Sequence, residues 1–438
     1  MFTAFARAFR TPDLRRKLLF TLAIMAVFRL GSFIPTPGVS YTNVQQCITR
    51  GDTTGTFALI NLFSGGALLQ LSVFALGIMP YITASIIIQL LTVVIPRFEA
   101  LKEEGQSGTT KLTQYTRYLT IGLAILQSTT LVAIARSNSL FGTPCPKKIV
   151  PNDTVVTVLI MVITMTAGTG LIMWLGEVVT ERGVGNGMSL LIFTSIAAQF
   201  PTAIWSIKQQ NDASGHGWDT MLLVIAMGLV IMGLVVFVEQ SQRRVPVQYA
   251  KRMIGRRQYG GTSTYIPIKV NMAGVIPVIF ASSLLYLPAL VAQFQRNSTA
   301  AWVRWINTNL TRGDHPAYMM VYFLLIIFFT YFYVAITFNP DEVAENMKKY
   351  GGFIPGIRAG RPTAEYLDYV LTRITAPGAL YLGVISLIPL VALALLNANT
   401  SSFPFGGTSI LIVVGVGLET VKQIESQLQQ RHYEGFLR

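Results

Sequence analysis

Residues Asn61–Pro80 read NLFSGGALLQLSVFALGIMP, a segment too apolar for a loop and too interrupted by glycine and proline for one membrane-spanning helix. The apolar run continues through YITASIIIQLLTVVI to Ile95. From Ala58 to Ile95 it contains 38 residues. As a helix it would be about 57 Å long, against a hydrocarbon core of about 30 Å. As a helix, the run would therefore be nearly twice as long as one membrane crossing requires.

The rest of the chain has the composition of a polytopic membrane protein, because 52% of its residues are hydrophobic and only 12% are charged. A basic segment ending at Lys17 leads straight into the first apolar run, without a cleavable signal peptide. We predict an all-α integral membrane protein with ten transmembrane helices. The predicted spans are Leu18–Phe33, Ile78–Ile95, Tyr118–Ala135, Val155–Leu175, Met188–Ile207, Met221–Val238, Ala273–Ala292, Tyr318–Phe338, Ile374–Leu396 and Phe405–Val421.

The distribution of Lys and Arg orients these spans. With a cytoplasmic N-terminus, 25 of the 34 basic residues fall in inner segments and 8 in outer ones, and Arg29 lies within the first span. Both termini are therefore expected in the cytoplasm. The net charge of +14 then concentrates on the cytoplasmic face, where it would attract anionic lipid, RNA or an acidic protein surface.

Two short matches indicate an internal repeat. Gly77–Ser85 (GIMPYITAS) resembles Gly274–Ser282 (GVIPVIFAS), and Gly187–Ile192 (GMSLLI) resembles Gly407–Ile412 (GTSILI). Each pair is five predicted spans apart, and five spans per half make the second half inverted. We therefore predict two inverted halves, residues 1–207 and 208–438, around a central pore.

The repeat pairs Ile82 with Ile279 and Ile192 with Ile412. Four isoleucines at equivalent depths on four central helices favour an apolar constriction. Ordinary helix packing explains isoleucine in a membrane span equally well, and the residues alone leave both interpretations open.

Catalytic and ion-coupling chemistry is absent from the central parts of the spans. Glu177, Glu239 and Glu419 lie near predicted cytoplasmic ends. Arg29 is the charge well inside a span, and we favour its reaching the outer interface over a substrate site. The chain has no zinc-binding His-Glu-x-x-His motif and no phosphate-binding P-loop, so we expect neither an enzyme nor a cofactor.

Two cytoplasmic loops, residues 239–270 and 339–373, are long and basic. The first carries Arg243, Arg244, Arg252, Arg256 and Arg257, and its VPVQYA and TYIPIKV segments predict a strand pair. The second predicts helix starts at Asn339 and Thr363, with a Gly/Pro-rich turn between them that presents Arg358. The tendency of cytoplasmic loops to carry Lys and Arg explains part of this charge. Seven basic residues in one loop are more than orientation requires, and they favour docking of a large anionic partner.

Stretches from the first span to the tenth closely resemble the SecY family, the channel subunits of the bacterial Sec protein translocon. The matching stretches are VFRLGSFIPTPGV, NLFSGGALLQLSVFALGIMPYITASIIIQLL, EEGQSGTTKLTQYTRY, MWLGEVVTERGVGNGMSLLIF, QRRVPVQYAKRMIGRR, IPIKVNMAGVIPVIFASS, FNPDEVAENMKKYGGFIPGIR and FGGTSILIVVGV.

The resemblance implies a site with three parts and two halves hinged between the fifth and sixth spans. An apolar pore ring would consist of Ile78, Ile82, Met188, Ile192, Ile279 and Ile412, in which Met188 replaces the usual branched aliphatic residue. A re-entrant plug helix near residues 63–71 would include Phe63, Ser64, Gly65, Gly66, Ala67, Leu68 and Leu69. A static packing helix is the alternative for this segment. A lateral gate between the second and seventh spans would use Thr83, Gln89 and Asn271.

The resemblance also implies a function: translocation of unfolded secretory chains and lateral release of apolar segments into lipid. Expected partners are the SecE and SecG subunits, the SecA motor ATPase, the ribosome, signal peptides and nascent chains, with Arg358 as a central contact. The expected location is the bacterial inner membrane. An inverted-repeat transporter of small solutes is the runner-up, and a structural scaffold is a third possibility. For Cys47 and Cys145, both in predicted outer loops, we expect two unpaired cysteines rather than a disulfide.

Overall fold

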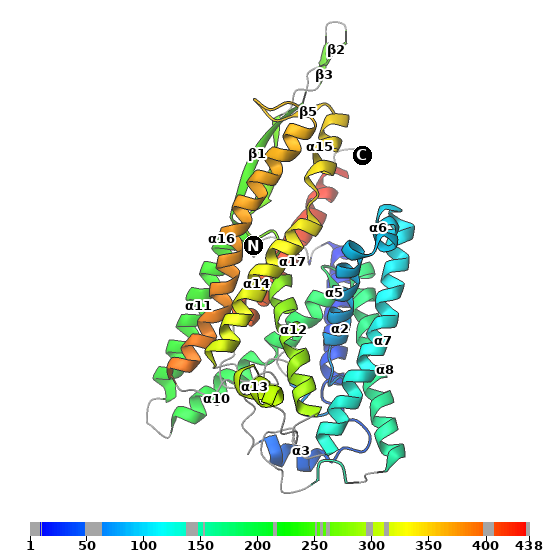
Figure 1. Cartoon of the computed structure of the whole chain (residues 1–438), viewed down its shortest axis with the longest axis vertical. Helices are drawn as coiled ribbons and strands as arrows, with labels where there is room; N and C mark the ends of the chain where they lie inside the picture. The colour runs from blue at the N-terminus through cyan, green and yellow to red at the C-terminus, as the bar shows by residue number, and fades with distance from the viewer. Residues whose placement is uncertain are drawn as a thin grey trace.

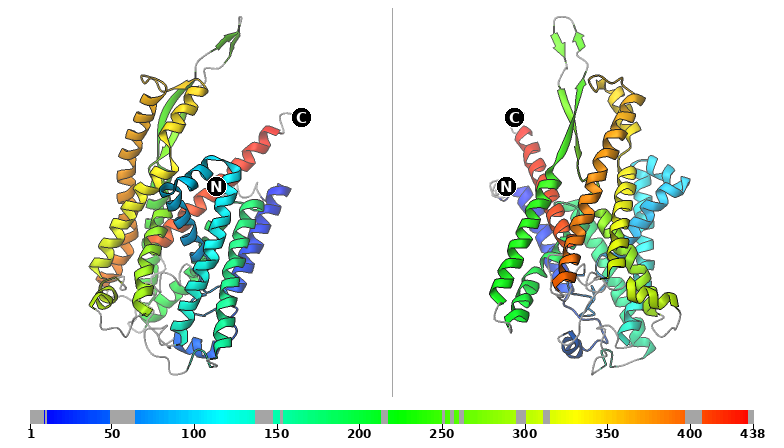
Figure 2. Two further views of the ribbon diagram at one scale, coloured as in Figure 1. Left: turned by 45° about the vertical axis from the view of Figure 1, so that its right-hand side comes forward. Right: turned by 60° about the vertical axis from the view of Figure 1, so that its left-hand side comes forward.

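The computed structural model describes residues 9, 11–48, 64–136, 148–151, 154–212, 217–249, 252–254, 257–259, 263–294, 301–310, 315–396 and 407–434. Its helices run mostly side by side as a bundle, with a β-hairpin projecting from one end (Figures 1 and 2). In the first half of the chain the helices are α2 (Pro12–Gly31), α3 (Tyr41–Ile48), α5 (Met79–Val94), α6 (Pro96–Glu103), α7 (Gln106–Arg136), α8 (Val155–Arg182), α9 (Gly187–Ala197) and α10 (Phe200–Asp212).

The second half contributes further helices and all five strands. The helices are α11 (Gly217–Gln240), α12 (Ile276–Phe294), α13 (Ala301–Asn309), α14 (Pro316–Thr337), α15 (Pro340–Lys349), α16 (Arg361–Leu396) and α17 (Gly407–Glu434). The strands are β1 (Gln242–Tyr249), β2 (Arg252–Ile254), β3 (Arg257–Tyr259), β4 (Ser263–Lys269) and β5 (Gly352–Phe353).

Each of the ten predicted spans coincides with a helix, and the fifth coincides with the consecutive pair α9 and α10. By length and composition, six helical stretches in the described part of the chain could cross a membrane. A seventh is added if α5 and α6, which are bent by 104° relative to each other, count as one span. The membrane-spanning part of the chain is thus helical and multi-pass, while the number ten stays a prediction.

The bend after α5 follows from the sequence. Pro96 disfavours helical backbone at the preceding residue, and Ile95 is extended, with φ −105° and ψ 112°. The chain then leaves the bundle as α6, which lies at the same end as the hairpin (Figure 1). The predicted end of the second span at Ile95 is therefore correct to one residue.

The strand pair predicted in the first basic loop is confirmed. Strands β1 and β4 are antiparallel, with Val245 opposite Ile266 and Val247 opposite Thr264. The alternation that predicted the pair buries Val245 and Val247 and leaves their neighbours exposed. The sequence did not predict that β5, from the second basic loop, pairs with the end of β1, so that the sheet has the order β4-β1-β5.

The two basic loops also share one hydrophobic core. It contains residues from both loops and from the ends of α14 and α16: Val245, Val247, Ile268, Ala273, Val334, Met347, Ile354, Leu367, Val370 and Leu371. We call this unit, residues 241–273 and 338–374, the basic lobe. Because the two loops pack on each other, the basic lobe is a folded platform rather than two separate loops.

The opposite end of the bundle carries α3 and α13 (Figure 1). Cys47 on α3 is buried and disulfide-bonded, so the expectation of two unpaired cysteines is wrong. Its partner is not predictable from a pattern, because spacing alone does not bring two outer loops together. Cys145 lies outside the described residues.

Candidate functional site

Six residues predicted to form a pore ring come together in one apolar cluster. The cluster includes Ile78, Ile192, Ile279 and Ile412 as buried members and Ile82 and Met188 as partly buried ones. They are contributed by the start of α5, by α9, α12 and α17. Segments far apart in the sequence therefore meet through apolar side chains.

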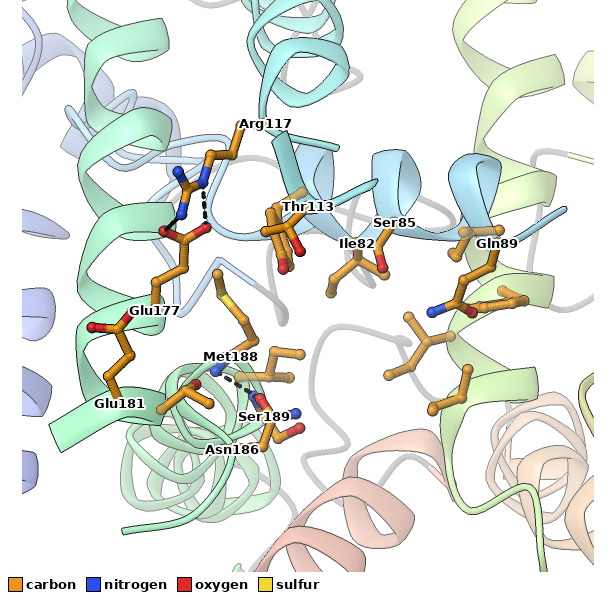
Figure 3. A pocket seen from close by; sticks show the side chains of 17 residues that line it. Ile82, Ser85, Gln89, Thr113, Arg117, Glu177, Glu181, Asn186, Met188 and Ser189 are labelled. Carbon is orange, nitrogen blue, oxygen red and sulfur yellow. Dashed lines mark hydrogen bonds and ion pairs between the residues drawn. The ribbon is translucent and has the colours of Figure 1, made fainter. Parts of the chain in front are cut away.

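A cavity of about 400 Å³ lies directly against this cluster. Four cluster residues, Ile82, Met188, Ile192 and Ile279, line it (Figure 3). The rest of its wall is apolar along α12, mixed along α5, where Ser85 and Gln89 line it, and polar where α7, α8 and α9 meet, through Thr113, Arg117, Glu177, Thr180, Glu181, Asn186 and Ser189. The cavity is thus amphipathic, because apolar and polar side chains line different parts of its wall.

Arg117 and Glu177 form the ordered polar part of this wall. Arg117 Nε donates to Glu177 Oε1 at 2.8 Å and Nη2 donates to Oε2 at 2.7 Å, a bidentate ion pair between α7 and α8 (Figure 3). Both charges are satisfied within the pair, so neither is offered to a coupled ion. The sequence analysis missed Arg117, and missed Glu177 as its partner, because the partners are 60 residues apart.

Helices α5 and α12 start with the same local geometry. Gly77 has φ 55° and Gly274 has φ 61°, and each helix begins two residues later. Ile82 N donates to the Ile78 carbonyl in α5, as Ile279 N does to the Val275 carbonyl in α12. These residues are equivalent in the predicted repeat, and only glycine takes such φ values at low cost. The repeated sequence therefore gives a repeated structure.

Helix α9 is positioned by its cap and by a close approach to α8. The Asn186 side chain accepts from the backbone N–H groups of Met188 and Ser189. A Cβ on Gly187 would lie 2.0 Å from the Gly176 carbonyl oxygen. Glycine at both positions lets the two helices touch, as small residues do in membranes. This contact sets the place of Met188 beside the cavity.

The plug helix expected near residues 63–71 is not helical over its described part. Residues 64–71 form consecutive turns. Gly65, Gly66 and Leu71 have φ values of 70°, 89° and 47°, and left-handed residues interrupt a right-handed helix. Phe63 lies outside the described residues. We call residues 64–71 the turn segment.

The turn segment is buried on the far side of the cluster from the cavity. Ser64, Ala67, Leu68 and Leu69 are all less than 9% exposed. A Cβ on Gly65 would lie 3.3 Å from the Ser195 Cα, and one on Gly66 would lie 3.9 Å from the Gln199 side chain. From the start of α9 the cavity is lined by Asn186, Met188, Ser189 and Ile192, of which Met188 and Ile192 belong to the apolar cluster. The turn segment lies further along, against Ser195 of α9 and Gln199 just beyond its end.

The three predicted gate residues have different surroundings. Helices α5 and α12 pack on each other through an apolar cluster that includes Ile86 and Phe280. Gln89 faces the cavity, and the Thr83 hydroxyl donates to the Met79 carbonyl of its own helix at 2.9 Å. Asn271 is buried but bonds to Glu239 at the end of α11, not to α5. The polar residues thus do not bond across the α5–α12 contact in the described chain.

Five of the six predicted partner-binding arginines lie in the described part of the basic lobe. Arg243 and Arg244 are exposed on β1, and Arg358 is exposed between β5 and α16. Arg252 and Arg257 belong to the short strands β2 and β3 of the projecting hairpin. Arg256 lies outside the described residues. The predicted helix start at Asn339 is confirmed, since its side chain caps α15, whereas α16 starts at Arg361 rather than Thr363.

No group of three potential metal-binding side chains exists among the residues that the structure describes. The site is therefore built from apolar side chains, one internal ion pair and exposed arginines. An apolar constriction can seal and open, and exposed arginines can dock an anionic partner.

Comparison with known proteins agrees with this arrangement. The SecY family model matches residues 72–421. The protein translocase subunit SecY of Streptomyces scabiei is 70% identical over 441 residues and covers 100% of both chains. The protein of the same name from Mycobacterium bovis is 58% identical over 447 residues, again with full coverage of both.

Solved channels share the fold at low sequence identity. A protein-conducting channel has a TM-score of 0.65 at 18% identity, covering 94% of this chain and 91% of that chain. Sec61 in a canine ribosome–channel complex from the endoplasmic reticulum has a TM-score of 0.62 at 17% identity, covering 94% and 91%. By its family match and its full-length relatives, this chain belongs to the SecY family of protein translocase channel subunits, a family without enzymatic activity.

Proposed function

We propose that this chain is the protein-conducting channel of a bacterial Sec translocase. It passes unfolded secretory chains across the membrane and releases apolar segments sideways into lipid. The observation that carries this proposal is the order along α9: an amphipathic cavity, then the apolar cluster that contains the six predicted ring residues, then the buried turn segment.

In this proposal the apolar cluster is the pore ring in its closed form. An apolar constriction excludes ions by dewetting, yet it gives way to an extended chain because it makes no specific bonds. The turn segment, residues 64–71, is the plug, which blocks the path beyond the ring. The repeated geometry of α5 and α12 supports two inverted halves, 1–207 and 208–438, with ten spans between them.

Helices α5 and α12 form the lateral gate of the proposed channel. Their contact is apolar, so parting them exposes side chains that lipid tails or an apolar signal segment can replace. Gln89 on the cavity wall would contact the entering chain. The Thr83 hydroxyl bonds within α5, so parting α5 from α12 breaks no hydrogen bond of this residue.

We propose that the basic lobe faces the cytoplasm and receives the partner that drives translocation. The start of α2 and the end of α17 pack together through Leu14, Val184 and Ile424, which puts both terminal helices at one end of the bundle. Positive charge then orients that end inward, in the inner membrane of a bacterium. SecA or the ribosome would dock on the exposed arginines, and the solved ribosome-bound Sec61 and Ssh1 channels support the second of these.

The remaining partners follow from the same proposal. The chain has no P-loop, so the energy must come from the docked motor or from chain synthesis. SecE and SecG would cover part of the helix surface that faces lipid. Anionic lipid would bind near the +14 net charge.

The test is reconstitution of the full chain with SecE and SecG in vesicles containing anionic lipid. With SecA, ATP and a secretory precursor, we expect precursor protected from added protease, and none without the motor. Uptake of amino acids, sugars and ions is measured in the same vesicles without a motor. Solute uptake without precursor protection would reject the channel in favour of the transporter.

A further inference from the structure

Arg29, the charge inside the first predicted span, points at the turn segment. Its Nη1 donates to the Gly65 carbonyl oxygen at 2.6 Å. Its Cζ lies 4.6 Å from the centroid of the Phe33 ring. The expectation that Arg29 reaches the outer interface did not foresee this contact, because a backbone carbonyl acceptor leaves no trace in side-chain patterns.

The two ends of the turn segment are held by different chemistry. At the Leu71 end the bonds are neutral and come from the backbone: Thr36 N donates to the Leu71 carbonyl at 3.0 Å, and Val73 N donates to the Ile34 carbonyl at 2.9 Å. At the Gly65 end the bond comes from a cation. A hydrogen bond from a charged donor contributes more than a neutral one, and more again where water is excluded.

The Gly65 end is also the end that lies against α9. The space for a Cβ on Gly65 is filled by the Arg29 guanidinium at 3.2 Å and by Ser195 at 3.3 Å. Ser195 is one turn of α9 beyond Ile192 of the apolar cluster. The Arg29 contact therefore holds the part of the turn segment that is nearest the proposed pore.

We propose that Arg29 is a positioning residue that latches the turn segment in the closed channel and so sets the threshold for opening. This inference rests on the proposed function, in which the turn segment blocks the pore. Moving the segment removes the Gly65 carbonyl from the guanidinium, which must then be solvated by water. Opening of the latch is thereby coupled to wetting of the pore.

The latch differs from a purely structural arginine in what its loss would change. A structural role in α2 predicts poor assembly and slower translocation of every substrate. A latch predicts normal assembly, a leakier resting channel and acceptance of precursors with defective signal sequences. It also predicts that Arg29 matters only while the turn segment is present.

The test compares Arg29→Gln, Arg29→Lys and deletion of residues 64–70, each in the full chain with its partner subunits. The open fraction of the resting channel is measured in planar bilayers. For Arg29→Gln we expect a rise of about ten- to a hundredfold, the range given by loss of a charge-assisted hydrogen bond. Arg29→Lys should rise less, because lysine keeps the charge but loses the planar donor geometry.

The matched control is Arg304→Gln on α13, which removes an exposed positive charge at the same end of the molecule and should leave the open fraction unchanged. In the background with residues 64–70 deleted, Arg29→Gln should add nothing. If the deletion raises leak and neither Arg29 variant does, the latch is rejected. If the deletion itself leaves leak unchanged, the plug in the proposed function is rejected. If Arg29→Gln fails to assemble, Arg29→Lys decides alone, and parental leak in it rejects the latch.

Discussion

Asn271 Nδ2 donates to Glu239 Oε1 at 2.5 Å, which joins the turn before α12 to the last turn of α11. The same amide donates to the Gly274 carbonyl at 3.1 Å. Beside it, Val270 N donates to the Ser241 carbonyl, and a Cβ on Gly378 of α16 would lie 2.4 Å from the Val270 carbonyl oxygen. Asn271 therefore fixes the base of α12 to the second half of the chain rather than to α5.

This bond predicts that Asn271 and Glu239 act as a pair on the gate. Asn271→Leu leaves a half-buried carboxylate without its amide partner, so the base of α12 should loosen by about 1 kcal/mol. Signal segments should then insert at lower hydrophobicity, measured with a graded series of apolar segments. Glu239→Gln keeps an acceptor and is the conservative control. Fully additive effects of Asn271→Leu and Glu239→Ala would show that the two residues are not coupled.

The apolar cluster predicts a leak on polar substitution. Ile82→Asn combined with Ile279→Asn places two amides beside the cavity and should wet the resting pore, because dewetting needs an apolar surface. Single-channel recording should show resting conductance well above that of the parent. The control, Ile82→Leu, keeps the surface apolar and should stay closed. Equal conductance in the Asn variant and the control would show that the apolar cluster does not seal the resting pore.

Arg358 predicts a defect in driven translocation. It lies between Gly356 (φ 85°) and Gly360 (φ 106°), and the Thr363 hydroxyl donates to its carbonyl at 2.8 Å, so the turn is stiff and the guanidinium is exposed. Arg358→Glu should reduce SecA-driven translocation at least tenfold, and Arg358→Lys should be intermediate. Channel integrity is scored by leak and by chromatography.

The control for Arg358 is three residues away. Arg361 is exposed and pairs with Glu365 of its own helix at 3.0 Å, so its charge is already engaged. Arg361→Glu should therefore affect translocation far less than Arg358→Glu. Similar defects in both variants would mean that the lobe contributes only diffuse charge.

The ion pair on the cavity wall predicts a difference in stability. Glu177 has 19% of its side chain exposed and bonds Arg117 through both oxygens, whereas Glu104 is 50% exposed and meets Lys111 at 3.4 Å. A double-mutant cycle on Arg117 and Glu177 should give a coupling of about 1 kcal/mol, measured by thermal unfolding in detergent. The cycle on Lys111 and Glu104 should give only a few tenths. Equal coupling energies for the two pairs would show that burial of Glu177 does not strengthen its ion pair.

Hydrophobic periodicity and turn residues predicted much of the fold, because they report which face is buried and where a helix must stop. The end of the apolar run at Ile95 marked the end of α5 to one residue, and alternating valines marked β1. The internal repeat placed Ile82 with Ile279 and Ile192 with Ile412, and the structure puts all four in one cluster.

The remaining features depend on contacts that no local pattern encodes. Gly65 and Gly66 were expected to lie within a plug helix, but they and Leu71 have left-handed backbone angles, and the segment forms only turns. Pairing of β5 with β1, the Arg117–Glu177 bridge and the Arg29–Gly65 bond each join segments that are distant in sequence. Long-range partners of this kind are chosen by tertiary packing, which one sequence read by itself does not show.

The central claim is that a translocating chain passes through the apolar cluster. Single cysteines replace Ile192 and Ile412 in the cluster, and a control cysteine replaces Leu222 on α11, a residue that is 66% exposed. A secretory precursor carrying a cysteine-reactive probe is stalled midway with SecA and ATP. The account predicts adducts at positions 192 and 412, dependent on the motor and the signal sequence, and none at 222. Adducts at 222 with none at the two cluster positions would show that the chain takes another path.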